Sequence, residues 1–173
     1  MATWTIDTAH SEIGFKVKHL VVSTASGKFT AFEGTVEAST DDFSDAKVTF
    51  SADIDSIHTG NEQRDGHLKS ADFFDAEQFP KLTFTSTSVE KSGDDFKITG
   101  DLTLKGVTKP VVINAEFGGI EKSLYGQIVA GFEVTAKINR QDFGLSWSAV
   151  TEAGGLVVAN DVKLHANIEL IKG

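Results

Sequence analysis

The stretch AKVTFSADI, residues 46–54, alternates without a break between apolar and polar side chains. Its even positions carry Ala, Val, Phe, Ala and Ile, while its odd positions carry Lys, Thr, Ser and Asp. Successive side chains of a β-strand point to opposite faces of the sheet, so this pattern predicts a strand with one apolar face and one polar face. Most of the chain on both sides of this stretch repeats the pattern.

Seven further segments alternate in the same way and are joined by mostly short turns; they span residues 11–19, 26–39, 82–87, 96–104, 109–118, 125–138 and 161–170. The phase of the second segment shifts near Thr30-Ala31, which predicts a bulge. The 125–138 segment is the longest and indicates a tall barrel. Two packed sheets would show the same alternation, but an even strand count with hairpin-length links favours closure. We predict an all-β fold: an extended eight-stranded antiparallel barrel that forms a single domain over residues 1–173.

One long stretch, SIHTGNEQRDGHLKSADFFDAEQFP at residues 56–80, does not alternate. Thr59 and Glu62 stand in the spacing of a capping box, so a helix is predicted to begin there. Ser70 is predicted to cap a second short turn, and Phe79-Pro80 ends the segment because the residue before a proline favours extended geometry. We therefore expect a helical insertion between the third and fourth strands that covers one end of the barrel.

Composition excludes several classes of function. The chain has no cysteine, so it cannot form a disulfide framework or a thiolate metal site. Its formal net charge of −9, without a cluster of Lys and Arg along the sequence, argues against nucleic acid as a partner. No apolar run is long enough to predict a transmembrane segment. The N-terminus lacks the features of a secretion leader, which predicts a cytoplasmic location as written, or a periplasmic one if a leader has been removed.

The predicted inward faces are rich in phenylalanine, and the chain has 13 Phe against one Tyr. These rings could fill a solid core, but Gly and Ala residues share the same faces, and a barrel of this size can hold one small ligand. We therefore predict a cavity for an elongated apolar ligand. The expected contact residues are Ile13, Phe15, Val17, His19, Phe32, Val36, Val48, Phe50, Phe84, Leu102, Leu104, Ala130, Phe132, Val134 and Ile138.

The two arginines of the chain, Arg64 and Arg140, both lie in irregular segments. Each could tie its segment to the barrel through a carboxylate such as Asp65 or Asp142, or could receive a polar head group at the cavity mouth. His67 is a third candidate for this head-group or lid role. The histidines show no metal-ligand spacing and no nucleophile elbow is present, so neither a metal site nor a catalytic residue is predicted.

Five segments, in order and with matching gaps, resemble the YceI-like family: DTAHSEIGFKVKH (7–19), GKFTAFEG (27–34), SIHTGNEQRDGHLKSADFFDAEQFPKLTF (56–84), GDLTLKGVTKPV (100–111) and INRQDFGL (138–145). The resemblance implies an extended lipocalin-like barrel that binds a long isoprenoid lipid, such as a polyisoprenoid or an isoprenoid quinone, without a further cofactor. It also implies that homodimers are common.

The first hypothesis is therefore binding, sequestration or transport of such a lipid. A lipid-modifying enzyme that uses polar residues at the mouth is the alternative, and a solid barrel that serves as an interaction scaffold is the third.

Overall fold

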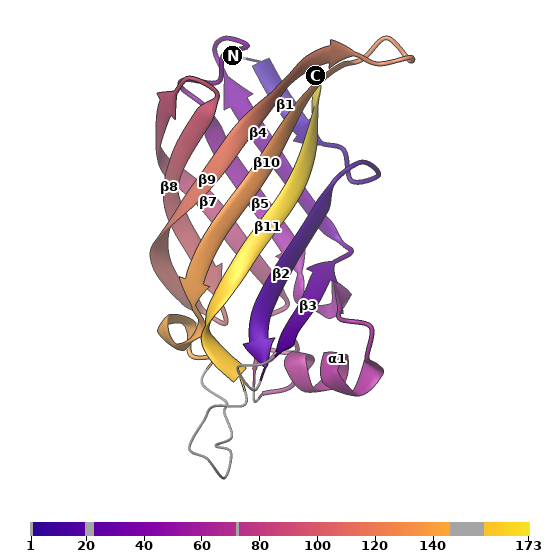
Figure 1. Ribbon diagram of the computed structural model, residues 1–173, viewed down its shortest axis with the longest axis vertical. Coiled ribbons are helices and arrows are strands. Elements are labelled where there is room, and N and C mark those ends of the chain that lie inside the picture. The colour runs from indigo at the N-terminus through magenta and orange to yellow at the C-terminus, as the bar shows by residue number, and fades with distance from the viewer. Residues whose placement is uncertain (1, 20–22, 72, 146–157) are drawn as a thin grey trace.

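The computed structural model describes residues 2–19, 23–71, 73–145 and 158–173. Within these residues, eight antiparallel strands close into a tall barrel (Figure 1). In order around the barrel they are β1 (Ala2–Ile6), β4 (Phe32–Ala38), β5 (Lys47–Asp53), β7 (Lys81–Ser92), β8 (Asp95–Leu104), β9 (Val107–Lys122), β10 (Ile128–Asn139) and β11 (Val158–Lys172). The barrel closes because β11 pairs with both β10 and β1. The predicted fold is confirmed.

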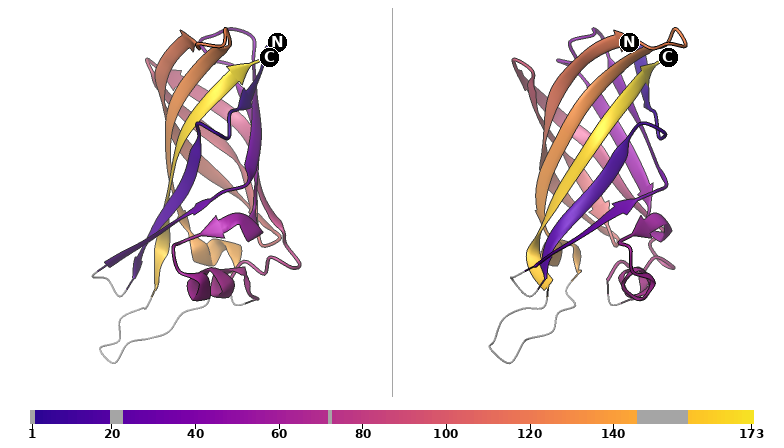
Figure 2. Two further views of the ribbon diagram at one scale, coloured as in Figure 1. Left: turned by 90° about the vertical axis from the view of Figure 1, so that its right-hand side faces the viewer. Right: turned by 45° about the vertical axis from the view of Figure 1, so that its right-hand side comes forward.

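Three further strands extend the wall at the lower end of the barrel (Figure 2): β2 (Glu12–His19), β3 (Ser23–Phe29) and β6 (Ile57–His58). β2 pairs with β11 between Val158 and Asn167, and β3 lies between β2 and β6. The predicted 26–39 strand is thus divided at Thr30-Ala31, where the bulge was expected. Because the chain bends there, β3 pairs with β2, while β4 pairs with β1 and β5.

The sequence patterns missed β1 and β6 and misplaced the ends of several strands, among them β7, β9, β10 and β11. β1 has five residues and too few apolar positions for the alternation to stand out. β9 is the longest strand, with 16 residues, because it runs past both of its expected ends. Pro110 lies opposite Asp101 of β8, but the pairs between β9 and β10 stop at Ile113. Pro110 is therefore outside the ladder with β10, where a residue without a backbone N–H is tolerated. The predicted longest strand, 125–138, begins instead at Ile128.

Gly118-Gly119 was expected to end this strand but forms a bulge within it. Gly119 pairs with Gly131 while Phe117 pairs with Phe132, so Gly118 is the extra residue. Gly119 has a φ of 127°, a conformation that glycine adopts readily and other residues do not. The bulge lets β9 and β10 continue past the rim of the barrel as a hairpin.

The expected helix is α1 (Glu62–Lys69), but the predicted capping box is wrong. The N-cap is Asn61, whose side chain accepts a hydrogen bond from the Arg64 backbone N–H at 3.0 Å. The Thr59 hydroxyl instead donates to Asp65 Oδ1 at 2.5 Å. Ser70 is the C-cap of α1, and the expected short turn follows it, because the Ser70 carbonyl accepts hydrogen bonds from the N–H groups of Phe73 and Asp75. The Ser70 hydroxyl does not cap that turn but donates to the His67 carbonyl.

The upper end of the barrel is closed by the loop at residues 39–46. Phe43 projects from this loop and is 2% exposed. Its ring centroid lies 5.0 Å from that of Trp4 and 5.2 Å from that of Phe132. Phe43 has a φ of 59°, a left-handed conformation that costs a non-glycine residue free energy. Packing of the ring into the core and the hydrogen bonds of the loop offset that cost, so Phe43 acts as a plug.

Asp42 makes the stability of this loop dependent on pH. Hydrogen bonds from Thr40 Oγ1 and from the N–H and hydroxyl of Ser44 lower the pKa of Asp42 to about 2. Because the folded-state pKa lies below the ordinary value of 3.8, the contribution is present above pH 3.8 and is lost as the pH falls toward 2.

We therefore expect Asp42→Asn to be less stable than the wild type at pH 5 and to approach it at pH 2. Urea unfolding of both proteins across this range is the measurement. A difference in unfolding free energy that stays constant with pH would show that ionisation of Asp42 does not support the loop.

Candidate functional site

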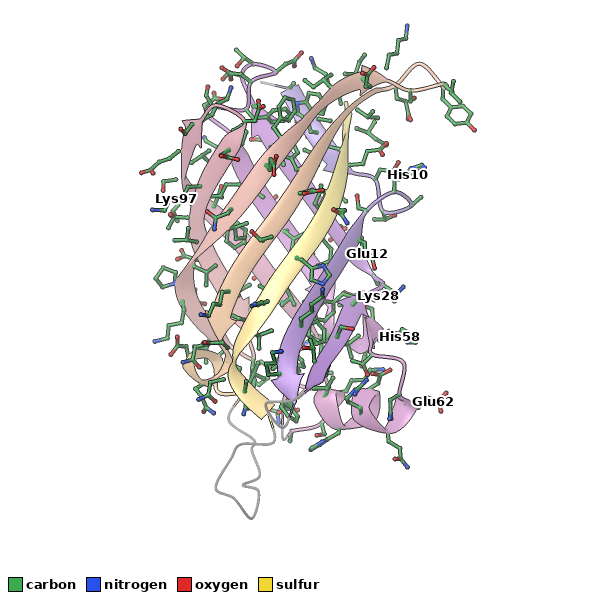
Figure 3. The ribbon with its side chains drawn as sticks, in the orientation of Figure 1. His10, Glu12, Lys28, His58, Glu62 and Lys97 are labelled. Carbon is green, nitrogen blue, oxygen red and sulfur yellow. The ribbon has the colours of Figure 1, made fainter. Side chains whose placement is uncertain are left out.

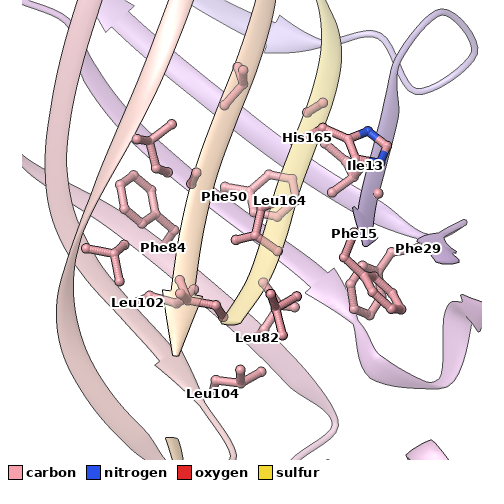
Figure 4. A pocket seen from close by; sticks show the side chains of 18 of the residues that line it. Ile13, Phe15, Phe29, Phe50, Leu82, Phe84, Leu102, Leu104, Leu164 and His165 are labelled. Carbon is pink, nitrogen blue, oxygen red and sulfur yellow. The ribbon is translucent and has the colours of Figure 1, made fainter. Parts of the chain in front are cut away.

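The barrel encloses a cavity of about 650 Å³, which runs from the α1 end toward the Phe43 plug. Its wall is almost entirely apolar, and Figure 4 shows Phe50, Phe84 and Leu164 among the side chains that line it. Twelve of the predicted contact residues border the cavity: Ile13, Phe15, Val17, Val36, Val48, Phe50, Phe84, Leu102, Leu104, Phe132, Val134 and Ile138.

The other three predicted contact residues differ. Phe32 packs against the core around the cavity, with its ring centroid 6.3 Å from that of Phe50. Ala130 is 1% exposed and belongs to the packed cluster around Trp4 and Phe43 at the closed end. The side chain of His19 lies outside the described residues.

Glycines keep the aromatic rings from filling the cavity. A Cβ atom added at Gly100 would lie 2.5 Å from Phe84 Cζ, and one at Gly27 would lie 2.5 Å from Phe15 Cζ. Each ring therefore lies against bare backbone on the wall. Cavity-lining alanines such as Ala136 leave further space. The combination explains how so many phenylalanines surround an open cavity, a point that alternation along each strand cannot show.

α1 borders the lower end of the cavity, and polar contacts tie it to Thr59, the residue that directly follows β6. Thr59 is at the centre of them: its N–H and hydroxyl both donate to Asp65 Oδ1, at 2.9 and 2.5 Å. Arg64 donates from Nε to Thr59 Oγ1 at 2.9 Å and from Nη2 to the Thr59 carbonyl at 2.8 Å. The link between Arg64 and Asp65 thus runs through Thr59 rather than through a direct fork. We call residues 59–69 the lid.

The lid also brings side chains of two kinds to the cavity. Leu68 supplies an apolar contact and packs against the core. His67 borders the cavity and meets the ring of Phe73 edge to face, at a centroid distance of 5.1 Å. Asn61, Gln63 and Arg64 border the same end. The cavity therefore has an apolar body and one polar end.

Arg140 lies in the short helix η2 (Arg140–Phe143) and is 2% exposed. Its Nε donates to the Ala159 carbonyl at 2.9 Å, and its Nη1 donates to the Leu145 carbonyl at 2.5 Å. Burial lowers the pKa of Arg140, although a guanidinium stays charged in proteins. These contacts join η2 to the beginning of β11 through backbone carbonyls, so Arg140 both supports the wall and borders the cavity.

One group of potential metal ligands lies on the outside of the barrel. Carboxylate oxygens of Asp7 and Glu169 and a ring nitrogen of His10 lie within 4.8 Å of one another. His10 Nδ1 is 2.7 Å from Asp7 Oδ2, and this hydrogen bond raises the pKa of His10 and lowers that of Asp7. The pair accounts for the arrangement by fixing the turn between β1 and β2.

Within the described part of the chain, no helix is long and apolar enough to cross a membrane.

Comparisons with known proteins agree with this architecture. A family model described as the YceI-like domain matches residues 4–170. UPF0312 protein SAS2572 of Staphylococcus aureus (strain MSSA476) is 42% identical over 170 residues, which cover 98% of this chain and 97% of that protein. The crystal structure of the Campylobacter jejuni YceI protein matches with a TM-score of 0.75 and 36% identity over 95% of each chain.

A polyisoprenoid binding domain from Saccharophagus degradans matches with a TM-score of 0.66 over 98% of each chain, and its 17% identity shows a shared fold alone. The family model and the 42% identical relative go further, because each spans nearly all of the sequence. The chain belongs to the YceI-like family.

Proposed function

We propose that this barrel binds one long-chain isoprenoid lipid, a polyisoprenoid or an isoprenoid quinone, and sequesters or carries it without chemistry of its own. The observation that carries the proposal is the cavity. Its volume of about 650 Å³ lies within the range of about 300–1,000 Å³ typical of small-molecule sites. An elongated cavity with an apolar wall favours a hydrocarbon chain over a polar metabolite, because a polar ligand would lose its hydration without gaining partners.

The two ends of the cavity favour one orientation of the lipid. The lid end offers Arg64, His67 and Asn61 as hydrogen-bond donors for a polar head group. The opposite end is closed by Phe43 and is apolar. We therefore expect the head group at the lid and the tail toward the plug. Family membership and the shared fold with a polyisoprenoid binding domain support the ligand class.

Lipid purified with the protein from its own cells tests the proposal. Native mass spectrometry followed by solvent extraction should show one prenyl lipid per chain. Ala136→Phe, purified in parallel, should carry none. Conversion of the extracted lipid by the protein would favour the enzyme alternative, and repeated preparations without lipid would contradict binding. The same spectra report whether the chain is a homodimer.

The lid provides a kinetic prediction. Segments held by few apolar contacts belong to the least stable parts of a fold, so opening of the lid should release the lipid. We expect Arg64→Ala to speed release more than it lowers the free energy of unfolding. Arg64→Lys should restore slow release only in part, because an ammonium group cannot reproduce the two donors that reach Thr59.

Hydrogen exchange across residues 59–69, with and without lipid, is the companion measurement. Protection should increase when lipid is bound. Equal protection in both states, together with unchanged release from Arg64→Ala, would mean that this segment is a fixed plug and that lipid enters elsewhere.

A further inference from the structure

Three lysines lie side by side on the outer wall of the barrel. Lys137 on β10 pairs directly with Lys163 on β11, and Lys163 pairs directly with Lys16 on β2. All three side chains are exposed. Like charges directly opposite each other on neighbouring strands are destabilising. Lys137 has a carboxylate 3.3 Å away on Asp161, but the row remains a concentration of positive charge on a chain of net charge −9.

Two more lysines share this face. Lys18 lies two residues beyond Lys16 on the same side of β2, and Lys28 on β3 pairs with Gly14 of β2. We call Lys16, Lys18, Lys28, Lys137 and Lys163 the lysine patch. The sequence shows no such cluster, because strand register brings together residues that lie far apart along the chain. Lys18 also borders the cavity, so the patch reaches the mouth at the lid end.

We propose that the lysine patch docks the barrel wall beside the lid end on an anionic phospholipid bilayer. The patch is positive and the phosphate groups of the bilayer are negative, so the two surfaces are complementary in charge. Contact with the phosphates would relieve the repulsion between the lysines of the row. The choice of a bilayer as partner rests on the proposed function, because the bilayer is where a long isoprenoid lipid resides. Docking beside the mouth brings the cavity to the lipid.

The lysine patch is a local concentration of positive charge on a chain that is acidic overall. Acidic residues lie at both ends of the barrel: Asp41, Asp42, Asp45, Asp94 and Asp95 at the plug end, and Asp55, Glu62, Glu77 and Asp142 near the lid end. The strands that separate the ends are long: at about 3.3 Å per residue, 16-residue β9 spans roughly 50 Å along its length. Salt screens exposed charges beyond about 10 Å, so the carboxylates at the plug end do not cancel the attraction. Because the lid end also carries carboxylates, the patch meets the bilayer through the wall formed by β10, β11, β2 and β3.

Flotation with vesicles of phosphatidylcholine and phosphatidylglycerol, free of isoprenoid lipid, tests the docking. Each lysine near an anionic surface contributes about fivefold in affinity, so Lys16→Gln with Lys163→Gln should weaken binding about thirtyfold. Neither residue borders the cavity. The matched control is Lys97→Gln with Lys122→Gln, which removes the same charge elsewhere; Figure 3 shows Lys97 on the other side of the barrel from Lys28. The control should weaken binding less than about threefold.

Removal of the lysine row should leave the unfolding midpoint unchanged or raised, because like charges no longer face each other. An equal loss in both double variants, or no vesicle binding by the wild type at low salt, would overturn the proposal. Tighter binding of single-stranded DNA than of vesicles would also overturn it and assign the patch to nucleic acid. Lipid loading from detergent solution, measured on the same proteins, tests the proposed function separately, because that assay contains no bilayer.

Discussion

Ala136→Phe is expected to abolish lipid binding while it lowers the free energy of unfolding by less than about 1 kcal/mol. Ala136 borders the cavity, between Ile113 on β9 and Leu164 on β11. A phenyl ring at this position can enter open space, and it then occupies the volume that the lipid chain needs. Retention of a labelled polyprenol through gel filtration reports binding, and urea unfolding reports stability.

Ala130→Phe is the matched control on the same strand. Ala130 faces the same side of β10 but is 1% exposed and packed in the closed-end cluster. An added ring there meets packed atoms, which typically costs about 1–3 kcal/mol. This variant should lose stability and keep its lipid. Heavy destabilisation by Ala136→Phe, with lipid binding unchanged, would contradict an open cavity at that position.

Phe43→Ala is expected to lower the free energy of unfolding by about 3–5 kcal/mol, as usual for the loss of a buried phenyl ring. The Phe43 ring touches Trp4, Phe117 and Phe132, so its loss opens the closed end of the barrel. Alanine carries a Cβ as phenylalanine does, so the backbone strain at φ 59° stays in both proteins and the difference reports the ring. Bound lipid should also dissociate faster through the second opening.

Leu124→Ala controls for the loss of a large apolar side chain without loss of packing. Leu124 is fully exposed in the turn between β9 and β10. Its replacement should leave both stability and lipid release unchanged. A loss of less than about 1 kcal/mol in Phe43→Ala would show that the Phe43 ring does not hold the closed end together.

The sequence predicts most of the strands because each has one face toward the barrel interior and one toward water. The Ala46–Ile54 alternation matches β5, which begins and ends within one residue of it. β1 escaped notice because it has only five residues, and Ala2, Trp4 and Ile6 give too short an alternation to stand out. Phe43 escaped notice because a single phenylalanine among Asp and Ser residues has the composition of an ordinary turn.

The alternation of apolar and polar residues along the strands predicts only part of the candidate site. Period-two spacing shows which side chains point inward, but it does not show whether the inward face is packed or open at a given height. Ala130 and Ala136 lie on the same face of the same strand, yet one is packed beneath the Phe43 plug and the other borders the cavity. That difference depends on which loop fills which end of the barrel, and this is a property of tertiary structure.

A crystal structure with an isoprenoid lipid that carries bromine at its tail tests the central claim most directly. We predict an anomalous peak inside the barrel near Phe132 and Phe43, with the head group beside Arg64 and continuous density for the chain between them. Bromine on the outer surface of the barrel, with the cavity free of lipid density, would contradict a binding site inside it.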